Sequence, residues 1–251
     1  MVMFTPSENW EFNSLGIYNY TRPGPYELYF NNIRLRALLD PGDLIEAGVF
    51  NGRTLLATAL LLREIGSEKL VWGFDSFSGF PDSSSKFDEI LLNEIDNDLG
   101  LDYKMRQQRL LDIRKILINS KIDKNNISSS GTFSDSKLSV IEQKIEFLGL
   151  KNIRLVPGLF VDTMTKENYI NIEIFSGFLD CDLYDSYITS LNFIWPRLIR
   201  GGALYADEYY SLKFPGARIA IDNFMKDKNF KKIMYSGDLN DEFERNLFIK
   251  L

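Results

Sequence analysis

Apolar runs of strand length alternate with segments of helical periodicity along most of this 251-residue chain. The strand-like runs fall at about residues 43–47, 70–74, 153–156, 174–178 and 202–205. Helices are expected at about residues 27–39, 53–65, 136–148, 188–198 and 217–226. This alternation predicts a single α/β domain: a Rossmann-like, doubly wound, mostly parallel sheet with helices on both faces.

Three further segments complete the predicted organisation. Two short strand patterns, at 230–235 and 246–249, are expected to form an antiparallel pair at the sheet edge. Residues 1–40 indicate an aromatic-rich arm or lid followed by a helix, and 41–251 the main domain. Residues 82–130 are too long for an ordinary connection and predict a helical insertion after the second strand, with a helix near 102–119. The arm could cover a ligand, pack as a flap or form a dimer contact.

The composition excludes several functional classes. A formal charge of −6 argues against nucleic acid as a partner. Histidine is absent, which removes Ser-His-Asp and Cys-His catalysis and the usual zinc ligands. The single cysteine, Cys181, cannot form an internal disulfide, in agreement with a reducing compartment. No signal peptide is evident and the longest apolar run, 55–62, is too short to span a bilayer. We therefore expect a cytoplasmic protein with no membrane partner.

Acidic residues follow two successive strand-like runs. Asp180 and Asp182 come after the run at 174–178, and Asp207 and Glu208 after the run at 202–205. Ligands of open α/β sheets bind at the carboxyl ends of the strands, and alternate residues of an extended segment share a face. Two acidic strand ends therefore favour a site for Mg²⁺ or Mn²⁺, which prefer carboxylate oxygens. Solvated loop carboxylates are the alternative.

The helix after Asp182 needs an N-terminal cap. One alternative role for Asp180 is to serve only as that cap, by accepting from the amide of Leu183 or Tyr184. Asp185 and Ser186 are the better candidates, because Ser186 directly precedes the periodic apolar residues. The cap of this helix is therefore expected within its own first turn.

The turn after the first strand also has the composition of a ligand-binding turn. Gly48 and Gly52 let the backbone approach a ligand closely, although the spacing is not the dinucleotide fingerprint. Glu46 would repel a pyrophosphate and favour a ligand amine, which disfavours an NAD-dependent oxidoreductase. Asp75 ends the second strand, the position that receives ribose hydroxyls in folds of this kind.

Several blocks, in this order, resemble the macrocin O-methyltransferase family of S-adenosylmethionine-dependent enzymes that methylate sugar hydroxyls. The matching blocks are 48–52, 73–81, 131–133, 158–163, 180–186, 196–198, 201–202, 207–209 and 216–221. They cover about 43–224, so 41–251 would be a class I methyltransferase domain. Two positions depart from the family pattern: Glu208 replaces a usual aspartate, and Arg53 stands where a small residue is commoner.

The resemblance implies a role for each block. Glu46 and the neighbouring backbone would hold the methionyl amine, Asp75 the ribose diol, and residues 158–160 would border the adenine. The full set expected to bind S-adenosylmethionine is Glu46, Ala47, Gly48, Asn51, Gly52, Asp75, Ser76, Gly158, Phe160 and Asp180. Asp182, Asp207 and Glu208 would bind the metal, with Asp180 or Asp182 as the general base.

The implied partners are a small-molecule acceptor and a second copy of the chain. The acceptor would be a natural-product glycoside or a nucleotide-activated sugar, and the protein a homodimer. A catechol-type O-methyltransferase acting on a small vicinal diol is the nearest alternative. A catalytically silent, cofactor-binding scaffold with the same fold is the alternative of a different class.

Overall fold

The computed structural model describes residues 4–82, 85–89, 96–169, 171–238 and 241–251, and it centres on one seven-stranded sheet in the order β3-β2-β1-β4-β5-β7-β6. The strands are β1 Asp43–Ala47, β2 Val71–Asp75, β3 Ile153–Pro157, β4 Ile174–Leu179, β5 Leu198–Ser211, β6 Phe230–Met234 and β7 Phe243–Lys250. Strands β1 to β5 pair in parallel, and β7 pairs antiparallel with both β5 and β6. The predicted doubly wound sheet and its antiparallel edge pair are confirmed.

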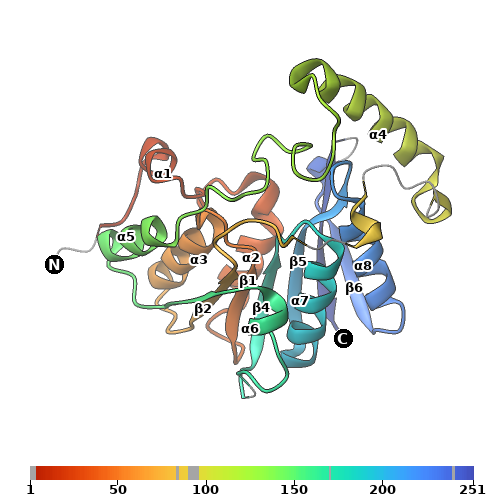
Figure 1. Cartoon of the computed structure of the whole chain (residues 1–251). Helices are drawn as coiled ribbons and strands as arrows, with labels where there is room; N and C mark the ends of the chain where they lie inside the picture. The colour runs from red at the N-terminus through yellow and green to blue at the C-terminus, as the bar shows by residue number, and fades with distance from the viewer. Residues whose placement is uncertain (1–3, 83–84, 90–95, 170, 239–240) are drawn as a thin grey trace.

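Helices cover both faces of the sheet (Figure 1). They are α1 Asn9–Leu15, α2 Glu27–Arg36, α3 Arg53–Glu64, α4 Asp96–Ile118, α5 Leu138–Leu148, α6 Phe160–Thr163, α7 Tyr184–Arg197 and α8 Pro215–Met225. Side chains of α2, α3 and α5 share one hydrophobic cluster, and side chains of α7 and α8 share a second. Successive residues of β1 divide between them, since Leu44 joins the first cluster and Ile45 the second. Strands covered on both faces are continuously apolar for this reason.

The N-terminal arm packs against the core. Phe12, Tyr20 and Phe30 are fully or almost fully buried in the cluster that contains α3. The Tyr205 hydroxyl of β5 donates a 2.7 Å hydrogen bond to the carbonyl of Pro25, which ties the arm to the centre of the sheet. The aromatic residues of this segment therefore act as core, and they bring the arm over the carboxyl ends of β4 and β5.

Between β2 and α5 the chain forms the short 3₁₀ helix η2 (Lys86–Asp88) and the long helix α4. Figure 1 shows α4 projecting away from the body of the molecule. Its attachment includes the Tyr103 hydroxyl, which donates to the carbonyl of Ser211 at 2.7 Å. Gly100, with φ of 81°, breaks the helix near its start. Parts of the expected insertion, 83–84 and 90–95, lie outside the described residues.

Strand β5 is longer than its sequence pattern suggested. The expected strand covered only 202–205, but pairing with β7 continues to Ser211 across an irregularity between Ala206 and Tyr210. Asp207 and Glu208 therefore lie within a strand whose paired residues on β7 are 32 to 46 positions further along the chain, which no local pattern reveals. Among the described residues, no helix is long and apolar enough to cross a membrane.

Candidate functional site

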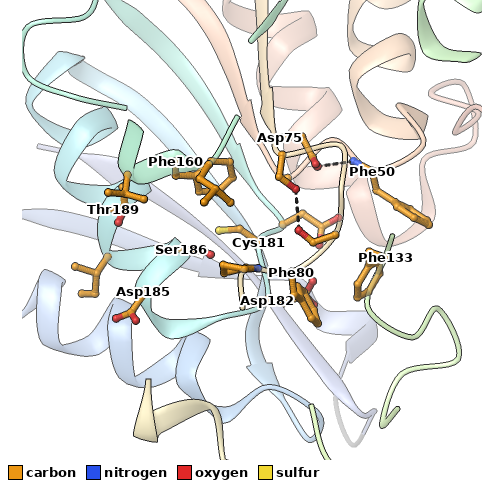
Figure 2. Close-up of a pocket in the computed structure, with 18 residues that line it drawn as sticks. Phe50, Asp75, Phe80, Phe133, Phe160, Cys181, Asp182, Asp185, Ser186 and Thr189 are labelled. Atoms are coloured by element: carbon orange, nitrogen blue, oxygen red, sulfur yellow. Dashed lines mark hydrogen bonds between the residues drawn. The ribbon is translucent and has the colours of Figure 1, made fainter. Parts of the chain in front are cut away.

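A cavity of about 440 Å³ opens at the carboxyl ends of β1, β2 and β4. It is lined by Gly48, Phe50, Asp75, Ser76, Gly79, Phe80, Pro81, Phe133, Leu159, Phe160, Val161, Asp180, Cys181, Asp182, Asp185, Ser186, Ile188 and Thr189. In Figure 2, Asp75 and Phe50 lie on one side of this space and Phe160 and Thr189 on the other. This is the edge at which the sequence predicted ligand binding.

Three carboxylates converge beside this cavity. One oxygen from each of Asp180, Asp182 and Glu208 lies within 4.8 Å of the others. Asp180 is half-buried and the other two are buried. The Asp180 amide donates to the carbonyl of Ala47 at 2.9 Å, which fixes the end of β4 against β1. Asp182 then adopts φ of 57°, an unusual value for a residue with a side chain.

Burial and like charges perturb the protonation of these groups. Burial raises the pKa of Asp182 to about 6 and raises the pKa of Glu208 well above its usual value. Burial, followed by the charge of Asp207, also raises the pKa of Asp180. Oε2 of Glu208 is buried without a hydrogen-bond partner. Clustered hard oxygens with an unpartnered buried atom fit a divalent cation such as Mg²⁺ or Mn²⁺.

Asp207 faces a different partner. Its Oδ1 accepts a hydrogen bond of 2.8 Å from Nε of Arg245 in β7, and Nη1 of Arg245 donates to Asp238 at 2.8 Å. Asp207 is not among the three clustered carboxylates. Its predicted role as a metal ligand therefore remains a prediction that would require the Arg245 pair to rearrange. Arg245 lies in no recognisable motif, because its contact with Asp207 depends on the register of β7 on β5.

The turn that follows β1 packs so closely against the end of β4 that only a glycine fits at position 48. Gly48 has φ of 89°, and a Cβ atom there would lie 1.7 Å from the carbonyl oxygen of Asp180. Asp75 links this turn to the next one: its Oδ2 accepts from the amides of Val49 and Phe50 at 2.8 and 2.9 Å. Its Oδ1 accepts from the amide of Phe77 at 2.7 Å. Asp75 thus fixes two turns while it also lines the cavity.

Glu46 lies behind the first turn. It is 1% exposed, does not line the cavity, and its Oε2 has no hydrogen-bond partner. Burial, followed by the charges of Asp180 and Asp75, raises its pKa well above the usual value. An unpartnered buried carboxylate oxygen is chemically suited to accept a hydrogen bond from an ammonium group.

The cavity includes only part of the predicted set of ten cofactor residues. Gly48, Asp75, Ser76, Phe160 and Asp180 line it, as does the predicted base Asp182. The predicted residues outside its lining are Glu46, Ala47, Asn51, Gly52 and Gly158.

Aromatic walls are the main feature that sequence reasoning missed. The Phe133 ring packs against Phe50 and Phe80, with both centroid separations 5.1 Å. Phe50 and Phe133 both have positive φ, so their rings are held by strained backbone. Phe80 and Phe133 belong to two of the blocks that carry the family resemblance, which was the available signal.

The prediction that Asp185 or Ser186 caps helix α7 was wrong. The helix begins at Tyr184, one turn ahead of the periodic apolar residues, and neither Asp185 nor Ser186 caps it. The Tyr184 amide instead donates to Asp88 of the insertion. A cap supplied from a distant segment leaves no sequence pattern near the helix.

The seven-stranded order, with its acidic strand ends, defines a class I methyltransferase fold. More particularly, the chain belongs to the macrocin O-methyltransferase (TylF) family, which it matches over residues 36–128 and 136–245.

Three relatives have established names. The chain is 25% identical over 185 residues to mycinamicin III 3''-O-methyltransferase of Micromonospora griseorubida, covering 73% of this chain and 60% of that protein. It is 28% identical over 174 residues to 8-demethyl-8-(2,3-dimethoxy-alpha-L-rhamnosyl)-tetracenomycin-C 4'-O-methyltransferase of Streptomyces olivaceus, covering 67% and 53%. It is 25% identical to demethyldecarbamoylnovobiocin O-methyltransferase of Streptomyces niveus, covering 73% and 58%. The chain thus spans less than two thirds of each.

Solved structures that share the fold include two methyltransferases. The calicheamicin methyltransferase CalS11 superimposes with a TM-score of 0.58 at 20% identity, covering 99% of this chain and 94% of that chain. The O-methyltransferase NovP superimposes with a TM-score of 0.55 at 22% identity, covering 88% and 78%.

Proposed function

We propose that the protein transfers a methyl group from S-adenosylmethionine to a hydroxyl of a sugar, with the help of a divalent metal. The observation that carries the proposal is the convergence of Asp180, Asp182 and Glu208 beside the cavity. Support for the acceptor comes from the relatives, one of which is named for a rhamnosyl substrate. The acceptor would be a natural-product glycoside or a nucleotide-activated sugar.

The cavity wall provides groups suited to each part of the cofactor. Phe160 offers an aromatic face for the adenine, with Gly158 close by in the chain, and Asp75 and Ser76 offer oxygens for the ribose hydroxyls. Gly48, with Ala47, Asn51 and Gly52 around the first turn, allows close approach of the methionyl end. Glu46 and Asp180 offer carboxylate oxygens for its ammonium group.

Asp182 and Glu208, with Asp180, would bind the metal, and Asp207 would join them if Arg245 released it. Bound Mg²⁺ or Mn²⁺ would polarise the hydroxyls of the acceptor and lower their pKa. Asp180 or Asp182 accepts the hydroxyl proton as the acceptor oxygen bonds to the methyl carbon and the bond from that carbon to sulfur breaks. Alignment of these atoms can contribute about 7–11 kcal/mol toward the barrier. The aromatic walls exclude water from the transfer.

A methyl-transfer assay tests this function. S-adenosylmethionine would be incubated with glycosides, nucleotide sugars and catechols, with Mg²⁺ or with EDTA, for the wild type and Asp182→Asn. Metal-dependent methylation of a sugar, lost in the variant, is the expected result. A preference for catechols would support the catechol-type alternative. Cofactor binding without turnover on any acceptor would favour the silent scaffold, and turnover unaffected by EDTA would remove the metal from the proposal.

We also propose a homodimer formed through α4. Met105 and Ile116 on this helix are 59% and 83% exposed. Arg109 and Asp112, also exposed, lie between them along the helix, and Asp112 contacts Gln108 and Lys115 of its own helix. An antiparallel copy of α4 would place an arginine opposite each aspartate. Light scattering on gel-filtered protein should give a dimer for the wild type and for the swap Arg109→Asp with Asp112→Arg. Arg109→Asp alone should be monomeric, and a monomeric wild type would contradict the proposal.

A further inference from the structure

Asp88, in the insertion, caps helix α7 from outside that helix. The amide of Tyr184, the first residue of α7, donates to Oδ1 of Asp88 at 2.8 Å across 96 positions of sequence. The N-cap position of α7 is Leu183, whose side chain has no acceptor. Asp88 is 5% exposed, so this contact is buried. The helix therefore depends on the insertion for a cap that its own sequence does not supply.

The segment around Asp88 fits into a notch between α7 and α8. The Phe87 ring stacks on the Tyr184 ring, with centroids 4.3 Å apart and planes at 28°. A Cβ atom at Gly216, near the start of α8, would lie 2.3 Å from Oδ1 of Asp88. The starts of two helices thus flank the carboxylate, and the partial positive charge of helix N-termini favours an anion there.

The capped residue follows closely on the acidic cluster. Asp182 lies two positions before Tyr184 and has φ of 57°. The amide of Leu183 donates to the carbonyl of Cys181 at 2.5 Å, so the turn at Asp182 is tight. A non-glycine residue in this conformation persists only when its surroundings fix it. The bond from the Asp180 amide to Ala47 fixes one end of the turn, and Asp88 fixes the other.

We propose that Asp88 is a positioning residue, which fixes the start of α7 and thereby directs the carboxylate of Asp182 toward Asp180 and Glu208. The insertion then completes the acidic cluster without contributing a ligand to it. The proposal rests on the proposed function, in which this cluster binds a divalent cation.

The test compares Asp88→Ala, Asp88→Asn and the control Glu89→Ala, which removes a neighbouring exposed carboxylate. Mn²⁺ alone is titrated calorimetrically, and hydrogen–deuterium exchange is followed in the amides of residues 182–187. Asp88→Ala should weaken Mn²⁺ binding about 10-fold or more, because it removes a residue that orients a metal ligand. Asp88→Asn keeps the acceptor oxygen and should weaken binding about twofold or less. Exchange in 182–187 should rise in Asp88→Ala alone.

A second variant leaves Asp88 itself intact. Gly216→Ala should favour α8 by helix propensity but displace Oδ1 of Asp88, so it should reproduce the loss of Mn²⁺ affinity. Faster amide exchange in Asp88→Ala with unchanged Mn²⁺ affinity would mean that Asp88 only caps the helix, and would overturn the proposal. If the wild type bound no Mn²⁺, the proposed metal site would be wrong. The positioning role of Asp88 would then be tested by hydrogen–deuterium exchange alone, and equal exchange rates in the wild type and Asp88→Ala would overturn it.

Discussion

The guanidinium of Arg245 binds the carboxylate of Asp207 through Nε at 2.8 Å, in a pair whose side chains are each 12% exposed. The same guanidinium binds Asp238 through Nη1 at 2.8 Å, and Asp238 also accepts from the backbone amide of Arg245. One cation on β7 therefore balances two buried carboxylates next to the acidic cluster. Because Arg245 pairs with Asp207, the cluster of described carboxylates consists of Asp180, Asp182 and Glu208 and does not include Asp207.

Arg245→Met should destabilise the protein by about 3–5 kcal/mol, because it leaves two buried carboxylates without their cation. Urea denaturation would measure the loss. Arg218→Met breaks the more exposed pair with Asp222, at 3.4 Å, and should lose about 1 kcal/mol or less. Asp207→Asn in the Arg245→Met background should recover part of the stability. A loss no larger than that of the control would contradict this account of the pair.

The acidic cluster should make the stability of the metal-free protein depend on pH. The pKa of Asp182 is raised to about 6 in the folded protein, above its unfolded value, so the folded protein binds this proton more tightly than the unfolded chain does. The resulting stability is present at low pH and is lost as the pH rises through about 6. The free energy of unfolding should fall by about 1 kcal/mol between pH 5 and pH 7, and Asp182→Asn should flatten this dependence. Chemical denaturation at several pH values would measure both.

Metal binding to the same cluster should release protons. A cation needs ionised oxygens, whereas burial raises the pKa of Glu208 and of Asp182 and so favours their protonated forms. Titrations of Mn²⁺ at pH 6 in two buffers of different ionisation enthalpy should give different apparent enthalpies. The affinity should rise between pH 5.5 and pH 8. Equal enthalpies in the two buffers would mean that the cation does not displace protons from this cluster.

Gly48→Ala should be strongly destabilising, because its Cβ would lie 1.7 Å from the carbonyl oxygen of Asp180. Gly66→Ala is the matched control: its φ of 73° is also positive, but a Cβ there meets nothing within 4 Å. Backbone strain alone should lower stability by about 1–2 kcal/mol in the control. Thermal unfolding should show a clearly larger loss at Gly48, and equal losses would mean that the first turn can move away from β4.

Phe160→Ala should weaken binding of S-adenosylhomocysteine about 10-fold, since stacking of a base on an aromatic ring contributes about 1–3 kcal/mol. Calorimetric titration would measure the affinity. Phe147→Ala removes an aromatic ring on α5 that is 51% exposed and is not part of the cavity lining, and it should leave the affinity unchanged. An unchanged affinity in Phe160→Ala would move the adenine to another part of the cavity.

The class of fold, and the edge of the sheet where the site lies, could both be predicted from the amino-acid sequence. Strand and helix periods are local properties, so the parallel strands and the antiparallel pair at 230–235 and 246–249 followed from short windows of residues. Asp180 and Asp182 were identified because an acidic residue directly after a buried strand reaches the ligand-binding edge. The glycine of the first turn, Gly48, was likewise apparent from its position.

Tertiary structure alone decided which side chains meet. Arg245 reaches Asp207 through the register of β7 on β5, and Asp88 reaches Tyr184 because the insertion folds back onto the start of α7. Each contact joins residues tens of positions apart. The first pairs buried opposite charges, and the second gives a hydrogen-bond acceptor to a backbone amide that has no partner within its own helix. No local pattern contains that information, so the sequence supplied the carboxylates while the packing of distant segments determined how they are arranged.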